Sequence, residues 1–223
     1  MQYEIEIKSL LGNKEAADRL LEKAKLLDPK TRLVSEQHQL NHYFKNGDLK
    51  KLTETLSDFL TDEQQKNLNE IIARATHINV RSREKNGKTI FIVKGSLDDV
   101  SAVHSHQRME FEAPLDMTID ELDKRITDSG WELEAKWQAD RQLYESMGLT
   151  LDMFFTPGYG YMIEFERVVA DDTDRETAHK QVVDVMEQLD VKELPNDRLE
   201  RMFAYYNNHW AEYYGTNKIF VVE

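Results

Sequence analysis

A strict alternation of charged and apolar residues opens this chain and constrains its fold more than any other feature. Residues 4–8 read Glu-Ile-Glu-Ile-Lys. In a β-strand, successive side chains point to opposite faces, so Glu4, Glu6 and Lys8 share one face and the two isoleucines share the other. A single strand of this kind is ordinary, because half-buried strands alternate in the same way. The alternation gains weight because it recurs in later segments.

Each recurrence again gives one face of a predicted strand to ionisable groups. Arg81 and Arg83 share a face, with Val80 and Ser82 opposite. The further members of this charged set are Lys94, Arg108, Glu110, Glu112, Arg141, Asp152, Glu164 and Glu166. Six or more strands therefore combine a charged face with an apolar face that helices can cover.

Turn signals divide the chain into short strands. Asn86-Gly87 predicts a tight hairpin because both residues tolerate positive φ. Gly148 and Pro157-Gly158 mark two further turns. The eight predicted strands cover about residues 2–8, 38–45, 77–84, 88–95, 107–114, 131–145, 148–155 and 160–169. Five of them follow one another with mostly short connections, which is typical of antiparallel pairing.

Apolar stripes at helical spacing predict helices between and after the strands. Asn13 is a candidate N-cap, and Thr118 with Glu121 has the form of a capping box. No linker separates two blocks of different composition. The sequence therefore predicts one domain over residues 1–223, with a helical insertion at about 48–75 and C-terminal helices at about 173–214.

Two folds satisfy the alternation. An open sheet would leave its charged face in water, and a closed barrel would turn that face inward. A solvent face usually mixes Thr, Ser, Gln and Lys, whereas this shared face is almost entirely Glu, Asp, Arg and Lys. Eight antiparallel strands are enough to close a barrel around side chains or one small ligand. The sequence therefore favours an α+β protein with an eight-stranded antiparallel closed β-barrel, a tunnel with a charged interior and helices packed outside.

Composition excludes several classes of function. The net charge of −13 disfavours nonspecific binding to DNA or anionic membranes. The absence of cysteine excludes disulfides, thiolate metal sites and cysteine nucleophiles. No apolar run approaches the roughly 20 residues that a membrane helix needs, and no signal-peptide pattern is present. We expect a cytoplasmic protein, and the sequence leaves a homodimer open.

Charges inside a barrel need water or ligands, because burying them unpaired would be prohibitive. A water-filled tunnel that holds a polyanion and divalent cations meets this requirement. Arginine and lysine side chains would bind phosphoryl oxygens. Carboxylates would hold Mg²⁺ or Mn²⁺, which prefer oxygen ligands.

The ordered set of motifs resembles the CYTH superfamily, the triphosphate tunnel metalloenzymes. The motifs that carry this resemblance are Glu4-x-Glu6-x-Lys8, Arg81-x-Arg83, Lys94, Arg108-x-Glu110-x-Glu112, Arg141, Asp152 and Glu164-x-Glu166. They follow the family's order across residues 2–169. The resemblance implies an eight-stranded tunnel, dependence on Mg²⁺ or Mn²⁺, and a small triphosphate substrate.

The resemblance also implies roles for individual residues. The acidic set, which would bind metal directly or through water, is Glu4, Glu6, Asp152, Glu164 and Glu166. The basic set, which would hold the substrate phosphates, is Lys8, Arg81, Arg83, Lys94, Arg108 and Arg141. Glu110 and Glu112 fit either a metal shell or a salt-bridge network that orients the arginines. Some hydrolytic relatives pair a lysine of the opening motif with a tyrosine, so the implied catalytic residues are Lys8, Tyr43, Glu6 and Glu164.

Two features depart from the family pattern. Many members have Lys-x-Arg in the sixth strand, whereas Ala139 stands two positions before Arg141 here. Lys136 is nearby and remains a candidate phosphate ligand, but it would face outward unless a β-bulge reversed the alternation. The insertion at 48–75 is also longer than the usual connection. Both departures leave the leaving group of the substrate open.

Three activities fit the predicted site. Metal-dependent hydrolysis of inorganic tripolyphosphate, a nucleotide or thiamine triphosphate is the favoured one. A class IV-type adenylyl cyclase, which makes cyclic AMP and pyrophosphate from ATP, would use the same charged groups. A protein that binds polyphosphate or a nucleotide without turnover is the third. The products formed from ATP would separate the first two.

Overall fold

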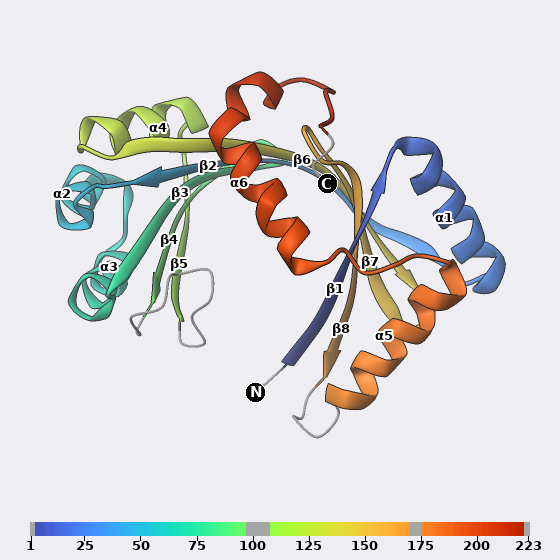
Figure 1. The fold of residues 1–223 in the computed structure, drawn as a ribbon. Coiled ribbons are helices and arrows are strands. Elements are labelled where there is room, and N and C mark those ends of the chain that lie inside the picture. The colour runs from blue at the N-terminus through green and yellow to red at the C-terminus, as the bar shows by residue number, and fades with distance from the viewer. Residues whose placement is uncertain (1–2, 97–107, 170–174, 221–223) are drawn as a thin grey trace. The chain divides into compact units, whose positions relative to one another are not determined.

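The computed structural model describes residues 3–96, 108–169 and 175–220 of the chain (Figure 1). It divides into two compact units. The first unit comprises Met1–His38 and Gln138–Glu223, and the second comprises Gln39–Trp137. Two long strands, β2 (Arg32–Lys45) and β6 (Glu132–Ser146), contribute residues to both units.

The first unit combines antiparallel strands with helices. Its remaining elements are β1 (Tyr3–Gly12), α1 (Lys14–Leu27), β7 (Leu149–Thr156), β8 (Gly160–Val169), α5 (Arg175–Leu189) and α6 (Asn196–Tyr213). Two helices, α1 and α5, cover one face of β1 and β8, and α6 is a further helix. Strand β8 pairs with β1 on one side and with β7 on the other, and β7 pairs with β6. Asn13 accepts a hydrogen bond from the Ala16 amide, so the predicted N-cap of α1 is confirmed.

The second unit also consists of antiparallel strands with helices packed on one face. Its remaining elements are α2 (Leu49–Thr55), a 3-10 turn, η1 (Ser57–Phe59), α3 (Asp62–Arg74), β3 (His77–Lys85), β4 (Lys88–Ser96), β5 (Arg108–Leu115) and α4 (Ile119–Asp128). The helices predicted at 48–75 are confirmed as α2, η1 and α3. The capping box of Thr118 and Glu121 is present at the start of α4.

All eight strands belong to one antiparallel sheet with the order β1-β8-β7-β6-β2-β3-β4-β5. Together with six α-helices among the described residues, this makes an α+β protein, as predicted. The predicted closure of the barrel is not confirmed, because no hydrogen-bonded pairing joins β1 to β5 within the described ranges. Alternation specifies which face of a strand is apolar, but it does not specify whether two edge strands meet.

Apolar strand faces pack against helices in both units. In the first unit, Ile7, Leu151 and Phe165 form a buried core with α1 and α5. In the second unit, Val80 and Phe91 are fully buried within a core that includes α2, α3 and α4. These faces are therefore the inward side of each layer, and the charged residues occupy the opposite side of the same strands.

Strand boundaries differ most from prediction at β2, which begins at Arg32 rather than near residue 38. Leu33 and Val34 are about half exposed there, so no buried face marks the extra residues as a strand. The predicted Asn86-Gly87 hairpin is confirmed, with φ of 50° and 77°.

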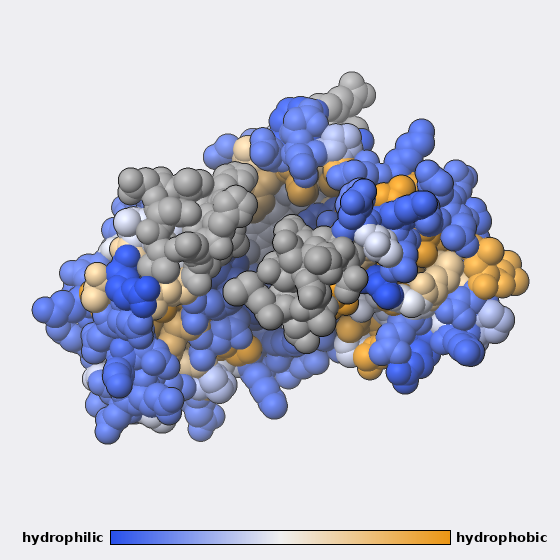
Figure 2. Space-filling view, turned by 90° about the horizontal axis from the view of Figure 1, so that it is seen from below, coloured by the Kyte–Doolittle hydropathy of each residue, from blue (hydrophilic) through white to orange (hydrophobic). Residues whose placement is uncertain are grey.

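Hydrophilic residues dominate the face shown in Figure 2, with hydrophobic residues in small separate groups. Among the described helices, none is both long and apolar enough to cross a membrane.

Candidate functional site

Cross-strand register brings charged residues of three strands into one row in the first unit. Lys8 of β1 lies directly opposite Glu164 of β8, and Glu164 lies opposite Asp152 of β7. Glu6 lies opposite Glu166 in the neighbouring row. The side chains share a face because they occupy alternate positions of antiparallel strands.

Glu164 is the centre of this row. Lys8 Nζ donates to its Oε1 at 2.8 Å, and Arg141 Nη2 donates to its Oε2 at 2.7 Å. Lys8 also forms an ion pair with Glu6. Glu164 is only 8% exposed, so its charge is balanced mainly by these two cations rather than by water.

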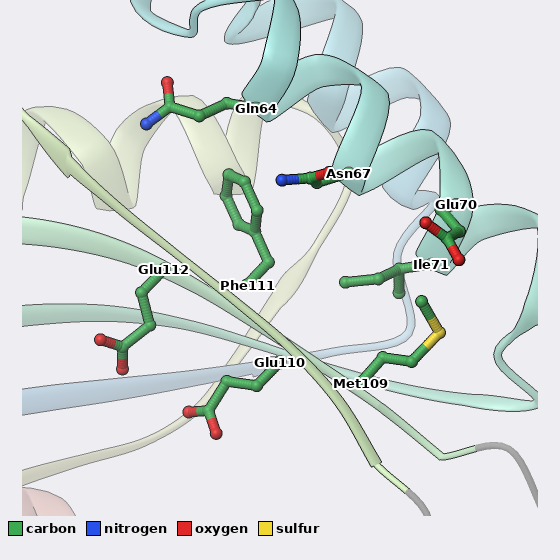
Figure 3. A pocket seen from close by; sticks show the side chains of 8 residues that line it. All are labelled: Gln64, Asn67, Glu70, Ile71, Met109, Glu110, Phe111 and Glu112. Atoms are coloured by element: carbon green, nitrogen blue, oxygen red, sulfur yellow. The ribbon is translucent and has the colours of Figure 1, made fainter.

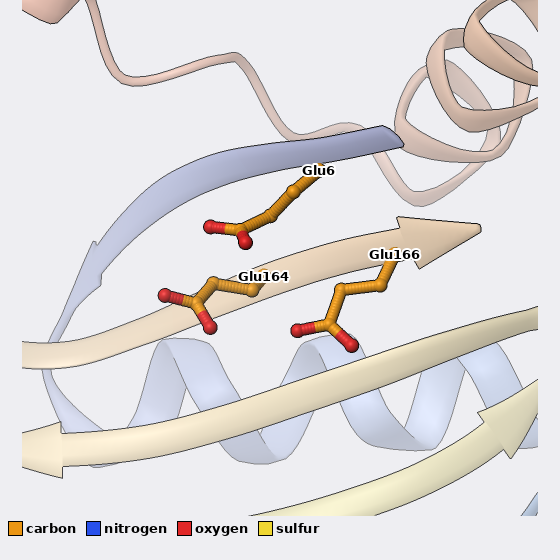
Figure 4. Close-up of side chains that lie close together, drawn as sticks. All are labelled: Glu6, Glu164 and Glu166. Atoms are coloured by element: carbon orange, nitrogen blue, oxygen red, sulfur yellow. The ribbon is translucent and has the colours of Figure 1, made fainter. Parts of the chain in front are cut away.

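Three carboxylates of the first unit form an acidic cluster, which comprises Glu6, Glu164 and Glu166. One oxygen from each lies within 4.8 Å of the others. Figure 4 shows the three side chains side by side on β1 and β8, with their carboxyl groups on the same side of the strands. An all-oxygen donor set of this charge suits Mg²⁺ or Mn²⁺ and does not suit soft metals. The residues therefore fit the cofactor that the sequence predicts.

Arg141 of β6 reaches the row diagonally, because its register partner on β7 is Phe154, two positions from Asp152. Arg141 Nε and Nη2 both donate to Asp152, with Nη2–Oδ2 at 2.5 Å, and the guanidinium lies 4.7 Å from the centroid of the Phe154 ring. Burial raises the pKa of Asp152 above its usual value, against the lowering effect of Arg141. Asp152 is thus engaged by Arg141 and is not one of the three clustered carboxylates.

In the second unit, the two arginines of β3 are each held by a residue of β2. Arg81 lies opposite Tyr43, with its guanidinium 4.4 Å from the centroid of the ring. Arg83 lies opposite Asn41 and donates from Nε to Asn41 Oδ1 at 2.7 Å. Asn79 accepts a further hydrogen bond from Arg81 Nε. Both guanidinium groups are therefore oriented before any ligand binds.

Lys94 joins Arg81 and Arg83, and these three residues form the basic cluster of the second unit. Glu110 and Glu112 supply acidic partners to this cluster. Lys94 Nζ lies 2.7 Å from Glu110 Oε1, and Arg83 Nη1 lies 3.4 Å from Glu112 Oε1. Glu110 and Glu112 point to the side of β5 opposite Phe111, which faces α3 (Figure 3). These ion pairs have the form of the predicted salt-bridge network.

A pocket of about 370 Å³ lies along the same strand, between α3 and β5. Glu70, Glu110 and Glu112 line it together with the amides Gln64 and Asn67 (Figure 3). It is acidic and amidic in character, so it offers no phosphate grip of its own.

Lys136 does not join the basic cluster. Its Nζ lies 3.3 Å from Asp123 of α4, on the face of the sheet that the helices cover. Strict alternation from Arg141 predicts this outward orientation for Lys136. The structure therefore gives the Lys136 amine an acidic partner on α4, and its assignment as a phosphate ligand stays a prediction.

Two predicted site residues are described only in part. The side chains of Glu4 and Arg108 lie outside the described part of the structure, although both residues belong to strands. The sequence analysis missed Asn41, Asn79 and Phe154. The signal for Asn79 was present, because Asn79, Arg81 and Arg83 follow the same period of two.

Solved structures with the same fold cover most of this chain. A protein from Vibrio parahaemolyticus described as a "putative adenylate cyclase" is 16% identical, with a TM-score of 0.54 over 91% of this chain and 98% of its own. A protein from Pyrococcus horikoshii is 18% identical, with a TM-score of 0.53 over 91% and 99%. One from Pyrococcus furiosus is 17% identical, with a TM-score of 0.52 over 85% and 92%. No protein-family profile and no curated sequence matches.

The strand order, the charged strand faces and these structural likenesses agree. This chain therefore shares the fold of these solved structures.

Proposed function

We propose that this protein hydrolyses a triphosphate in a reaction that depends on a divalent metal. The substrate would be inorganic tripolyphosphate or an organic triphosphate such as a nucleotide or thiamine triphosphate. The observation that carries the proposal is the acidic cluster of Glu6, Glu164 and Glu166, whose carboxylates converge within 4.8 Å beside two cations, Lys8 and Arg141.

Phosphoryl transfer asks little covalent chemistry of a protein and depends mainly on positioning and charge neutralisation. Arg81 and Arg83 are suited to hold phosphoryl oxygens, because their cross-strand partners already fix the guanidinium planes. Lys94 adds a point charge to the same cluster. Lys8 and Arg141 would exchange part of their contact with Glu164 for phosphate oxygens.

A divalent cation bound by the acidic cluster would neutralise charge on the phosphates and favour attack by water. Mg²⁺ and Mn²⁺ are the expected ions, because the three available ligands are carboxylates. Glu6 and Glu166 are the more accessible members of the cluster and Glu164 is the buried one, so Glu164 would fix the position of the ion. Tyr43 and Lys8 remain the predicted catalytic pair.

Phosphate release from tripolyphosphate tests this proposal. We expect turnover with Mg²⁺ or Mn²⁺, loss of turnover in excess EDTA, and loss of turnover in Glu6→Gln. Asp18→Asn is the matched control, because Asp18 is an exposed carboxylate of α1 that pairs only with Lys14 in the described contacts. Equal phosphate release with and without EDTA would overturn the proposed mechanism.

An adenylyl cyclase is the second candidate, and the structural likeness to the Vibrio protein, a "putative adenylate cyclase", supports it. In that reaction the ribose 3′-hydroxyl would attack the α-phosphorus and pyrophosphate would leave. Hydrolysis is the simpler assignment, because it needs only water in addition to the charged groups and the metal. Incubation with ATP separates the two, since ADP and phosphate indicate a hydrolase and cyclic AMP with pyrophosphate indicates a cyclase.

A further inference from the structure

A buried polar network lies behind the arginine-bearing strands of the second unit. His42 of β2 is 1% exposed and Ser82 of β3 is fully buried. Both bind the carboxylate of Asp123, which α4 brings against the sheet: His42 Nδ1 lies 2.7 Å from Oδ2, and Ser82 Oγ donates to Oδ1. An ionised carboxylate only accepts hydrogen bonds, so Nδ1 of His42 carries the proton.

The two residues held by Asp123 are direct partners in the sheet. His42 and Ser82 occupy the same rung of the β2–β3 ladder. One carboxylate therefore fastens both strands at a single rung, with one oxygen for each strand. Because buried polar groups are costly to leave unpaired, this arrangement also fixes α4 relative to the rung.

The rungs on either side carry the residues proposed to grip phosphate. Tyr43 lies opposite Arg81 on one side, and Asn41 lies opposite Arg83 on the other. Their side chains point to the face opposite His42 and Ser82, because neighbouring positions of a strand alternate. A shift of the fastened rung would therefore move both guanidinium groups relative to each other.

The charge of Asp123 is stabilised where it lies. Burial opposes its ionisation, but hydrogen bonds from His42 and Ser82 and the positive charge of Lys136 outweigh this effect, so the pKa of Asp123 is lowered. Lys136 Nζ approaches the same oxygen as His42, at 3.3 Å. The negative charge of Asp123 is thus balanced by a cation of the same unit, Lys136.

A nucleophilic role for Ser82 does not fit this geometry. Ser82 donates to the Asp123 carboxylate, which is already engaged by His42. Ser82 is also fully buried on the helix-covered side of the sheet. The network can act on a substrate only through the strands that it holds.

We propose that Asp123 is a positioning residue for triphosphate binding, acting through His42 and Ser82 on the spacing and orientation of Arg81 and Arg83. The inference rests on the proposed function, because it assigns to these arginines the grip on phosphate. It adds a residue on the far side of the sheet, on a helix that carries none of the predicted site residues.

Asp123→Asn is the first test, with tripolyphosphate as the probe. The amide keeps the shape of the carboxylate, but its nitrogen can only donate, so Asp123→Asn loses one of the two acceptors that bind His42 and Ser82. We expect the KM for tripolyphosphate to rise about tenfold with a much smaller change in kcat, since orientation of the phosphate ligands is lost while the acidic cluster is intact. Asp128→Asn is the control, because Asp128 lies on the same helix and forms only an exposed pair with Lys124 in the described contacts.

A double-mutant cycle separates positioning from general loss of stability. If Asp123 acts through Arg83, the change in KM caused by Asp123→Asn should shrink to less than twofold in an Arg83→Ala background. Ser82→Ala removes the hydrogen bond from Ser82 to Asp123 and leaves the one from His42, so it should raise KM by an intermediate amount. This variant tests the inference even if Asp123→Asn does not fold. Effects that multiply in full in the double variant would overturn the inference.

A readout that needs no ligand distinguishes failure of this inference from failure of the proposed function. The Nε–Hε resonance of Arg83 reports its hydrogen bond to Asn41, and we expect it to shift or broaden in Asp123→Asn and not in Asp128→Asn. An unchanged resonance, or unchanged tripolyphosphate affinity by calorimetry, would refute the positioning role alone. A wild-type chain that fails to bind tripolyphosphate would refute the proposed function and, with it, this inference.

Discussion

Glu164 shows how single side chains set the character of the acidic cluster. Each of its carboxylate oxygens accepts from a different cation, Lys8 on Oε1 and Arg141 on Oε2. A metal ion that approaches Glu164 must therefore compete with two protein cations for the same oxygens. The affinity for metal depends on the charge of the carboxylate as well as on its place in the cluster.

Replacement of Glu164 by Gln should weaken Mn²⁺ binding by about tenfold or more, because a carboxylate ligand and its charge are lost. Calorimetric titration with Mn²⁺ measures this directly and does not depend on turnover. Glu145→Gln is the control, since Glu145 is an exposed carboxylate of the same unit that pairs with Arg32. Equal Mn²⁺ affinity in Glu164→Gln and wild type would remove Glu164 from the metal site.

The sequence predicts which face of a strand a charged residue occupies better than it predicts which residue that side chain will contact. Alternation along β6 predicts an outward orientation for Lys136, and the Lys136 amine lies beside Asp123 of α4. Alternation could not show that Arg141 binds Asp152 and Glu164, because those contacts depend on the register of β6, β7 and β8. His42 carried no signal at all, since one histidine in an alternating strand does not reveal a carboxylate on a distant helix.

At the scale of elements, Gly160 allows the first residue of β8 to approach β1 closely. Gly160 begins β8 with φ of +81°, and a Cβ there would lie 2.0 Å from the Gly12 carbonyl oxygen. Gly87 of the β3–β4 hairpin has a similar φ of +77° but no atom within 4 Å of the corresponding position. Alanine at Gly87 would therefore introduce backbone strain alone, whereas alanine at Gly160 would introduce the same strain and a steric clash.

Gly160→Ala should lower the free energy of unfolding by about 2 to 5 kcal/mol, from left-handed strain together with overpacking against β1. Gly87→Ala, with strain alone, should cost only about 1 to 2 kcal/mol. Denaturant unfolding of the two variants and wild type gives both values. A Gly160→Ala variant no less stable than Gly87→Ala would mean that β1 and β8 do not meet this closely.

The attachment of α4 to the sheet should depend on pH. Burial opposes ionisation of Asp123, but hydrogen bonds from His42 and Ser82 hold its pKa below the usual value in the folded protein. A depressed pKa means that the ionised group stabilises the fold above the unfolded pKa, and that this contribution is lost as pH falls through the folded value. The difference in unfolding free energy between wild type and Asp123→Asn should be constant from pH 7 to about 5 and should shrink below about pH 4.

Unfolding titrations of wild type and Asp123→Asn from pH 7 to pH 3 measure this difference. Asp128→Asn serves again as the control on the same helix, because its exposed pair with Lys124 should contribute little at any pH. A stability difference that grows as the pH falls would contradict the lowered pKa of Asp123.

For the whole molecule, strand number, helix position and the apolar side of the sheet could be predicted, and closure could not. Alternation and turn residues such as Asn86-Gly87 act over a few positions, so one sequence is enough to locate them. Pairing of the edge strands β1 and β5 would depend on sheet twist and register accumulated over eight strands. No local sequence pattern specifies this accumulated twist and register. Within the described residues, hydrogen bonds do not close the sheet.

Metal binding should be visible in the stability of the whole protein. An ion that binds only the folded state stabilises it by about 2.7 kcal/mol at 100 times Kd, which corresponds to roughly 5 to 10 °C in Tm for a chain of this size. We expect Mn²⁺ to raise Tm in a saturable way, and NaCl of equal ionic strength not to do so. The rise should be lost in Glu6→Gln and retained in Asp18→Asn, because only Glu6 belongs to the three converging carboxylates. If saturating Mn²⁺ left Tm unchanged in wild type, this fold would hold its acidic cluster by Lys8 and Arg141 alone, and metal-dependent hydrolysis would have no site in the first unit.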